Sequence, residues 1–128
     1  MKDFKTERFD LVQNNQYNFY KLYVDGVCQF DTFMSEIESN KRYMDWFGYI
    51  IRFMEAISDQ FILKEHQFRH IESNDRNDIF EFKKELLRVY IVKQKPNIYI
   101  IFGGFKANQS NDIKKVKKLV NEFKQIEP

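Results

Sequence analysis

Four side chains in the C-terminal half have the types and spacing that suit contact with a phosphodiester. Lys83 ends a segment of alternating apolar and polar residues, Arg88 and Tyr90 stand two apart in the next apolar segment, and Lys106 follows a third. Alternate residues of a β-strand share a face, so Arg88 and Tyr90 are expected to project together on the exposed face. Cations that converge there would neutralise phosphate and stabilise the charge of phosphoryl transfer. Spacing alone equally allows a solvated face with scattered cations.

The charge of the chain is unevenly distributed. Residues 79–128 contain 11 Lys and Arg against 5 Asp and Glu, whereas residues 1–78 contain 10 against 14, so the net charge of +2 hides a basic half. This asymmetry favours a polyanionic partner, with solubility as the alternative. The lysines of the last segment are either a solvated face or an extension of an RNA-binding surface, which would include Lys114, Lys115 and Lys118.

The N-terminal half is predicted to supply a β-hairpin and two helices. Residues 1–15 show no period and are interpreted as a loosely attached extension, with one domain over 16–128. Residues 16–30 are rich in aromatic and β-branched types around Asp25-Gly26, which predicts a hairpin. Asp31 is expected to cap a short helix, and apolar residues spaced three and four apart over 43–57 predict a longer one.

The C-terminal half is predicted to form a three-stranded antiparallel meander and a basic helix. Residues 58–78 are interpreted as a loop with at most a short strand near 67–71, followed by strands at 79–83, 86–93 and 98–105. Gly103-Gly104 indicates a bulge or a close backbone approach. Ser110 or Asn111 is expected to cap a helix with an apolar stripe that ends at Phe123. The fold class is therefore α+β, in a single domain.

Other candidate sites are weaker. His66 and His70 are four apart, but the surrounding sequence has neither a helical stripe nor a convincing further ligand, so no metal and no cofactor is predicted. The single cysteine, Cys28, is interpreted as a small buried side chain. A single cysteine excludes an intramolecular disulfide. The sequence shows no visible export signal and no apolar run near the ~20 residues that span a bilayer. We therefore expect a cytoplasmic protein without a membrane partner.

The run FEFKKELLRVY from Phe80 to Tyr90, followed by IYIIFGGFKANQSNDIKKVKKL, resembles the RelE/HigB superfamily of bacterial type II toxins. Members have a strand that ends in a basic residue, a strand with Arg-x-Tyr, a third strand that ends in Gly-Phe-Lys, a polar loop and a basic helix. The order of elements, an N-terminal strand, a helical pair and a meander, is also similar. The resemblance spans residues 17–123 and is dense from Phe80 onward.

The resemblance implies the toxin of a type II toxin-antitoxin system, a metal-independent endoribonuclease that cuts mRNA in the ribosomal A site through attack by a 2′-hydroxyl. Its partners would be mRNA, the ribosome and a cognate antitoxin, typically a helix-turn-helix DNA-binding protein. Carried over by position, Arg88 would contact the scissile phosphate, Lys83 the attacking nucleotide and Lys106 the leaving group. Tyr90 would bind RNA or serve the structure.

The sequence also departs from the family pattern. Ala107 stands where a second lysine is common, and no His or Tyr follows the last strand as a candidate acid or base. A lysine with a pKa near ~10.4 is a poor base at neutral pH, so the general acid and base are not assigned. The alternative function is a catalytically inactive RNA- or protein-binding module of the same fold from a phage or mobile element.

Overall fold

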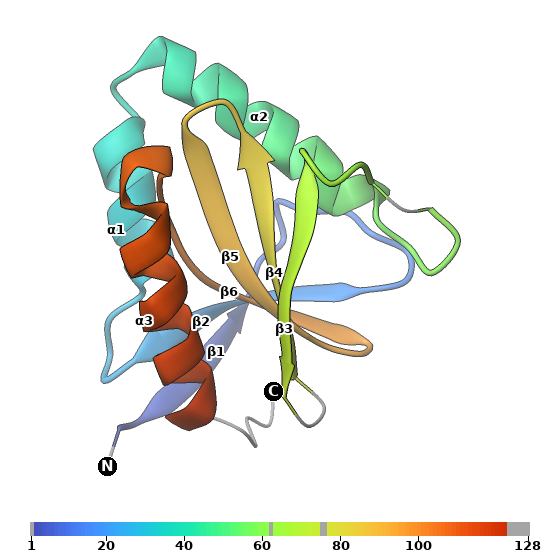
Figure 1. Cartoon of the computed structure of the whole chain (residues 1–128), viewed down its shortest axis with the longest axis vertical. Coiled ribbons are helices and arrows are strands. Elements are labelled where there is room, and N and C mark those ends of the chain that lie inside the picture. Colours follow the sequence, from blue (N-terminus) through green and yellow to red (C-terminus); the bar gives the residue numbers. More distant parts are fainter. Residues whose placement is uncertain (1, 62, 75–76, 123–128) are drawn as a thin grey trace.

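A six-stranded mixed sheet with helices on both faces forms the protein (Figure 1). The computed structural model describes residues 2–61, 63–74 and 77–122. No helix within those ranges is long and apolar enough to cross a membrane. In chain order the elements are β1 (Phe4–Arg8), β2 (Asn18–Val24), α1 (Gln29–Ile37), α2 (Lys41–Ala56), β3 (Phe68–Asn74), β4 (Asn77–Lys84), β5 (Leu87–Gln94), β6 (Asn97–Phe105), the 3₁₀ turn η1 (Lys106–Asn108) and α3 (Gln109–Glu122).

The sheet has the strand order β1-β2-β6-β5-β4-β3. Strands β3 to β6 form an antiparallel meander, so the three predicted strands are confirmed and β3 is added as a fourth. β2 pairs with β6 in parallel, because the chain crosses from one to the other through α1, α2 and the meander. The α+β fold class predicted from the sequence is confirmed.

The first core lies between the sheet and the pair α1–α2. Asn40 begins α2 by accepting a hydrogen bond from the Tyr43 amide at 3.0 Å, and the apolar stripe predicted for this helix faces the sheet. Each fully buried large apolar side chain contributes about 1.5–3 kcal/mol to folding. The core includes Phe30, Phe33, Ile37, Phe47, Ile50, Met54, Phe82, Val89, Ile91 and Ile100.

A second core lies on the opposite face, beneath α3. Tyr90 there is fully buried and Arg88 is 7% exposed, so the expectation that this pair lies on an exposed face was wrong. Strand periodicity tells which residues share a face, but it does not tell which face another element covers. Here the stripe of α3 covers it, and the core includes Leu22, Ile79, Tyr90, Val92, Tyr99, Ile101, Val116 and Val120.

The N-terminal predictions are partly wrong. Residues 4–8 are not a loose extension, because they form β1, paired in antiparallel register with β2 from Phe4 opposite Val24. Asp25 and Gly26 do adopt positive φ, but the chain then enters α1 at Gln29, so β1 and not residues 27–30 supplies the partner strand. Asp31 lies inside α1 and does not cap it; its carboxylate forms an ion pair with the Lys21 ammonium at 2.9 Å.

The remaining boundaries differ by a few residues. β3 runs from Phe68 to Asn74 and is longer than the predicted short strand. The ring of Phe68 in β3 stacks on the ring of Phe80 in β4, with the ring centroids 4.5 Å apart. α3 begins at Gln109, so Ser110 and Asn111 lie inside its first turn. The predicted end of its stripe, Phe123, lies outside the described residues.

Candidate functional site

The predicted cations gather at the end of the sheet where β4 turns into β5. Lys83 lies directly opposite Arg88 in the β4–β5 pair, and Arg88 lies opposite Gly104 of β6. Opposed residues project from the same face, which here is the face beneath α3. The Lys106 amide donates to the Leu86 carbonyl at 2.8 Å, which places η1 at the same end. The backbone thus brings the three cations together, although no hydrogen bond or ion pair joins their side chains in the described part of the chain.

The guanidinium of Arg88 forms hydrogen bonds within the β4–β5 turn. Its Nη1 donates to the carbonyls of Glu85 at 2.7 Å and Leu87 at 2.8 Å, while its buried Nε has no hydrogen-bond partner among the described residues. Glu85 has φ 52°, an unusual conformation for a residue with a side chain. Arg88 therefore stabilises the β4–β5 turn, and only a small part of its side chain reaches solvent.

A carboxylate from α3 lies against Gly104, the residue of β6 that pairs with Arg88. Asp112 is 8% exposed and lies against Gly104, where a Cβ would overlap its Oδ2. Burial raises the pKa of Asp112, and the nearby Lys115 ammonium lowers it by a smaller amount. On the other face a Cβ at Gly103 would overlap the Phe33 ring. The close backbone approach predicted for the glycine pair is thus confirmed on both faces.

A second row of polar groups lies next to the first. Glu81 is fully buried opposite Tyr90, forms an ion pair with Arg69 Nε at 2.8 Å, and accepts from Gln109 Nε2 at 2.9 and 3.0 Å. The buried Tyr90 hydroxyl has no hydrogen-bond partner within the described ranges. Burial raises the pKa of Tyr90, and the negative charges of Glu81 and Asp112 raise it further. Tyr90 therefore stays neutral at physiological pH.

We define the buried polar row as Lys83, Arg88 and Asp112 with the adjacent Glu81 and Tyr90. It combines cations that can bind a phosphate with carboxylates that can accept a proton. Sequence reasoning missed Asp112 as a member of this row, and Gln109 and Arg69 as its neighbours. The signal for Asp112 was the glycine pair, since a glycine in a strand often marks the close approach of another group.

The helix lysines lie apart from the buried row. On α3, Lys114, Lys115 and Lys118 are exposed, as a solvated face requires, and Lys117 forms an ion pair with Glu72 at 3.7 Å. Lys106 is also exposed, but it lies in η1 at the same end of the sheet as Arg88 and is not one of these outer lysines. The exposed lysines present charge to solvent, whereas the buried row lies under the first turn of α3. The structure therefore separates the two groups of cations into an outer and an inner set.

The other two candidates lie elsewhere: His70 is in β3, and Cys28 directly precedes α1. His70 Nε2 and Asp78 both contact the Ser73 hydroxyl, but this hydroxyl donates to Asp78, so His70 does not hold its proton as a triad base would. No cluster of three or more metal-ligating side chains occurs among the described residues. Cys28 is buried as predicted, and burial raises the pKa of its thiol, which keeps it unreactive.

Comparison with family models, with curated proteins and with solved structures finds no match to this chain.

Proposed function

We propose that this chain is a RelE/HigB-like toxin that binds RNA at the buried polar row and cuts mRNA on the ribosome. The observation that carries the proposal is the opposition of Lys83 and Arg88, with Lys106 at the same end of the sheet. The basic half of the chain and the resemblance from Phe80 onward support it. Action on ribosomes would place the protein in the cytoplasm, with a helix-turn-helix antitoxin as its inhibitor.

The proposed reaction uses one group for each change in charge. Asp112 accepts the proton of the 2′-hydroxyl as the 2′-oxygen forms a bond to phosphorus. Arg88 neutralises the phosphate oxygens. The bond from phosphorus to the 5′-oxygen breaks, and Lys106 donates a proton to that oxygen. The products are a 2′,3′-cyclic phosphate and a free 5′-hydroxyl. Preorganised charges of this kind contribute several kcal/mol to transition-state stabilisation.

The proposal requires the row to open. Arg88 is 7% and Asp112 8% exposed, so a phosphodiester reaches them only when η1 and the first turn of α3 move aside. The two hydrogen bonds from Gln109 to Glu81 hold that turn in place. RNA must therefore bind more tightly to the open form than to the closed form, as any ligand that shifts an equilibrium must.

The second candidate is a binding module of the same fold without catalysis. The specific observation in its favour is that both Nη1 protons of Arg88 go to backbone carbonyls, so this guanidinium edge is not free for phosphate. In that case the exposed lysines of α3 would carry RNA binding. The two candidates differ in whether the buried row or the outer lysines matter.

Induced expression and a translation assay test the proposal. We expect growth arrest in cells and cleavage of mRNA in a reconstituted mixture only when ribosomes translate it. Lys106→Ala should reduce cleavage about a hundred- to thousand-fold, whereas Lys118→Ala should weaken binding only. Normal growth at confirmed soluble expression together with intact mRNA would reject catalysis and leave the binding module. Equal damage from both variants would place the site on the helix.

A further inference from the structure

A pocket of about 870 Å³ lies on the face of the sheet that carries α2, away from the buried polar row. It is bounded by the segment that follows α2, by Tyr17, and by residues of β3, β4 and β5. Neither the resemblance nor the proposed function assigns it a role. Its lining includes the aromatic residues Tyr17, Phe61, Phe68 and Phe80, and the polar residues Ser58, Asp59, Glu65, Arg69, His70 and Lys93.

Flat aromatic surfaces form much of the wall. Phe68 and Phe80 stack with ring centroids 4.5 Å apart and an interplanar angle of 6°, and the His70 ring meets Phe80 edge-on at 5.0 Å. Phe61 remains 53% exposed at the pocket. Phe80 is covered by the Phe68 ring and by the Lys93 ammonium, so the exposed Phe61 ring is the surface open to a planar partner. An aromatic contact adds about 0.5–1.5 kcal/mol beyond the area it buries.

One cation in this pocket is not neutralised. The Lys93 ammonium lies 5.2 Å from the Phe80 ring centroid and 5.7 Å from that of Tyr17, and no carboxylate forms an ion pair with it in the described ranges. By contrast, Asp59 in the same pocket already binds Lys95 and the Tyr17 hydroxyl. The Asp59 carboxylate is close enough to Lys93 to interact with it electrostatically, and its charge opposes an anion, but it forms no ion pair with Lys93. The half-buried ammonium therefore retains donors for an anion.

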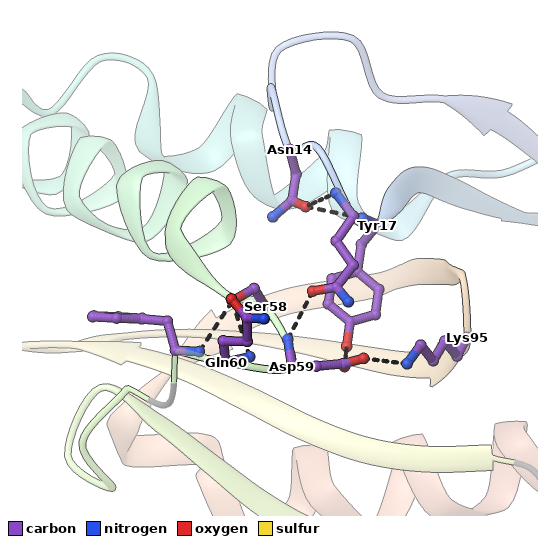
Figure 2. A network of polar contacts seen from close by, with 8 residues as sticks. Asn14, Tyr17, Ser58, Asp59, Gln60 and Lys95 are labelled. Carbon is purple, nitrogen blue, oxygen red and sulfur yellow. Dashed lines mark hydrogen bonds and ion pairs between the residues drawn. The ribbon is translucent and has the colours of Figure 1, made fainter.

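The pocket is formed before any ligand binds. Asn14 Nδ2 donates to the carbonyls of Met54 at 3.0 Å and Ile57 at 2.9 Å, which fixes the end of α2. Figure 2 shows Asp59 between the Tyr17 hydroxyl, 2.6 Å away, and Lys95. These contacts hold the wall in place, so a ligand would lose little free energy in ordering it.

We infer that this pocket binds a small molecule with a planar aromatic ring and an anionic group, the ring against Phe61 and the anion on Lys93. Nucleoside monophosphates and aromatic carboxylates share this chemistry. Glu65 also lines the pocket and is exposed, so its charge opposes an anion and limits affinity. Arg69 lines the pocket and also pairs with Glu81 of the buried polar row. The inference does not depend on RNA cleavage, because Phe61 and Lys93, on which it rests, do not belong to that row.

Amide NMR titration of the full chain tests the inference with four probes: 5′-AMP, indole-3-acetate, adenosine and inorganic phosphate. We expect saturable shifts around His70, Phe80 and Lys93 with at least one of the first two probes, and the stronger of these identifies the source of the ligand. Adenosine lacks the anion and phosphate lacks the ring, so each should bind at least about tenfold more weakly, given about 1.5–3 kcal/mol for a charged hydrogen bond.

Three variants identify the groups responsible. Lys93→Met keeps the apolar stem and should weaken binding of the anionic ring compound about tenfold or more without changing the affinity for adenosine. Glu65→Gln should strengthen binding of the anionic ring compound. Lys64→Met is the matched control, since Lys64 is exposed nearby but does not line the pocket. No shift at these residues with either anionic ring at about 10 mM would overturn the inference, as would equal affinities of the Lys93→Met and Lys64→Met proteins. Cleavage of mRNA should be unchanged in all three variants, which separates this outcome from failure of the proposed function.

Discussion

The Asp112 carboxylate of α3 lies so close to Gly104 of β6 that only glycine fits at position 104 without displacing it. This contact joins α3 to β6, whose Gly104 pairs with Arg88 of β5. The position of α3 and the composition of the polar row therefore depend on the same glycine.

Gly104→Ala should destabilise the protein, because the added methyl overlaps Asp112 and the helix must shift. We expect a loss of about 1–3 kcal/mol in the free energy of unfolding, measured by urea denaturation. Gly48→Ala is the control: no atom lies within 4 Å of the new methyl in α2, and alanine favours a helix by about 1 kcal/mol. If both variants were stabilised, the contact at Gly104 would be looser than described.

Asp112→Asn should stabilise the fold and abolish cleavage. Because burial raises the pKa of Asp112 in the folded state, the ionised carboxylate opposes folding at neutral pH. The gain over wild type should be present at pH 7 and should disappear as the pH falls below the pKa of the unfolded chain, about 3.9. Urea denaturation at several pH values measures it. A variant that is less stable at pH 7 would show that the carboxylate has a structural partner.

Arg88→Ala should reduce both stability and cleavage. On the exposed face expected from the sequence, this change would leave the fold intact, but in the structure two backbone carbonyls lose their donor, which costs about 1–3 kcal/mol. Lys83→Ala, at the opposed and only half-buried position, should lower cleavage with little change in the melting temperature. An unchanged melting temperature for Arg88→Ala would contradict its role in the turn.

Tyr17 should make stability fall at alkaline pH. Burial, with help from its hydrogen bond to Asp59, raises the pKa of Tyr17 to about 12. A raised folded-state pKa favours folding in full below the unfolded value of about 10, and this contribution is lost as the pH rises from there toward about 12. We expect the difference in stability between wild type and Tyr17→Phe to shrink over that window. A difference that is constant between pH 8 and about 11 would show that the phenol is not buried against Asp59.

The sequence predicted the elements that carry strong periodicity. The stripe of α2 was visible because its buried residues recur at helical spacing. Strands β5 and β6 were visible as runs of β-branched and apolar residues, which are buried on both faces of the sheet. β1 was missed because an edge strand such as FKTER is largely exposed and has no apolar alternation. The hairpin predicted at Asp25-Gly26 failed because turn chemistry specifies a bend but not the element that follows it.

The candidate site was predicted only in part. Strand pairing placed Lys83 opposite Arg88, since a short turn fixes the register of adjacent strands. The burial of Arg88 and the arrival of Asp112 could not be predicted, because both depend on where α3 packs. Amphipathicity shows that a helix has an apolar side but does not choose between the two faces of a sheet.

The parallel pairing of β2 with β6 has a consequence for synthesis on the ribosome. Asn18 lies beside Asn97, so β2 leaves the exit tunnel long before β6, its neighbour in the sheet, has been made. Until then the early part of the chain has β1 as its partner and exposes the edge that β6 later occupies. Contacts between residues so distant in sequence form slowly, and an unpaired edge invites association with other chains. The nascent protein therefore remains incomplete, and open to capture, until the last strand emerges.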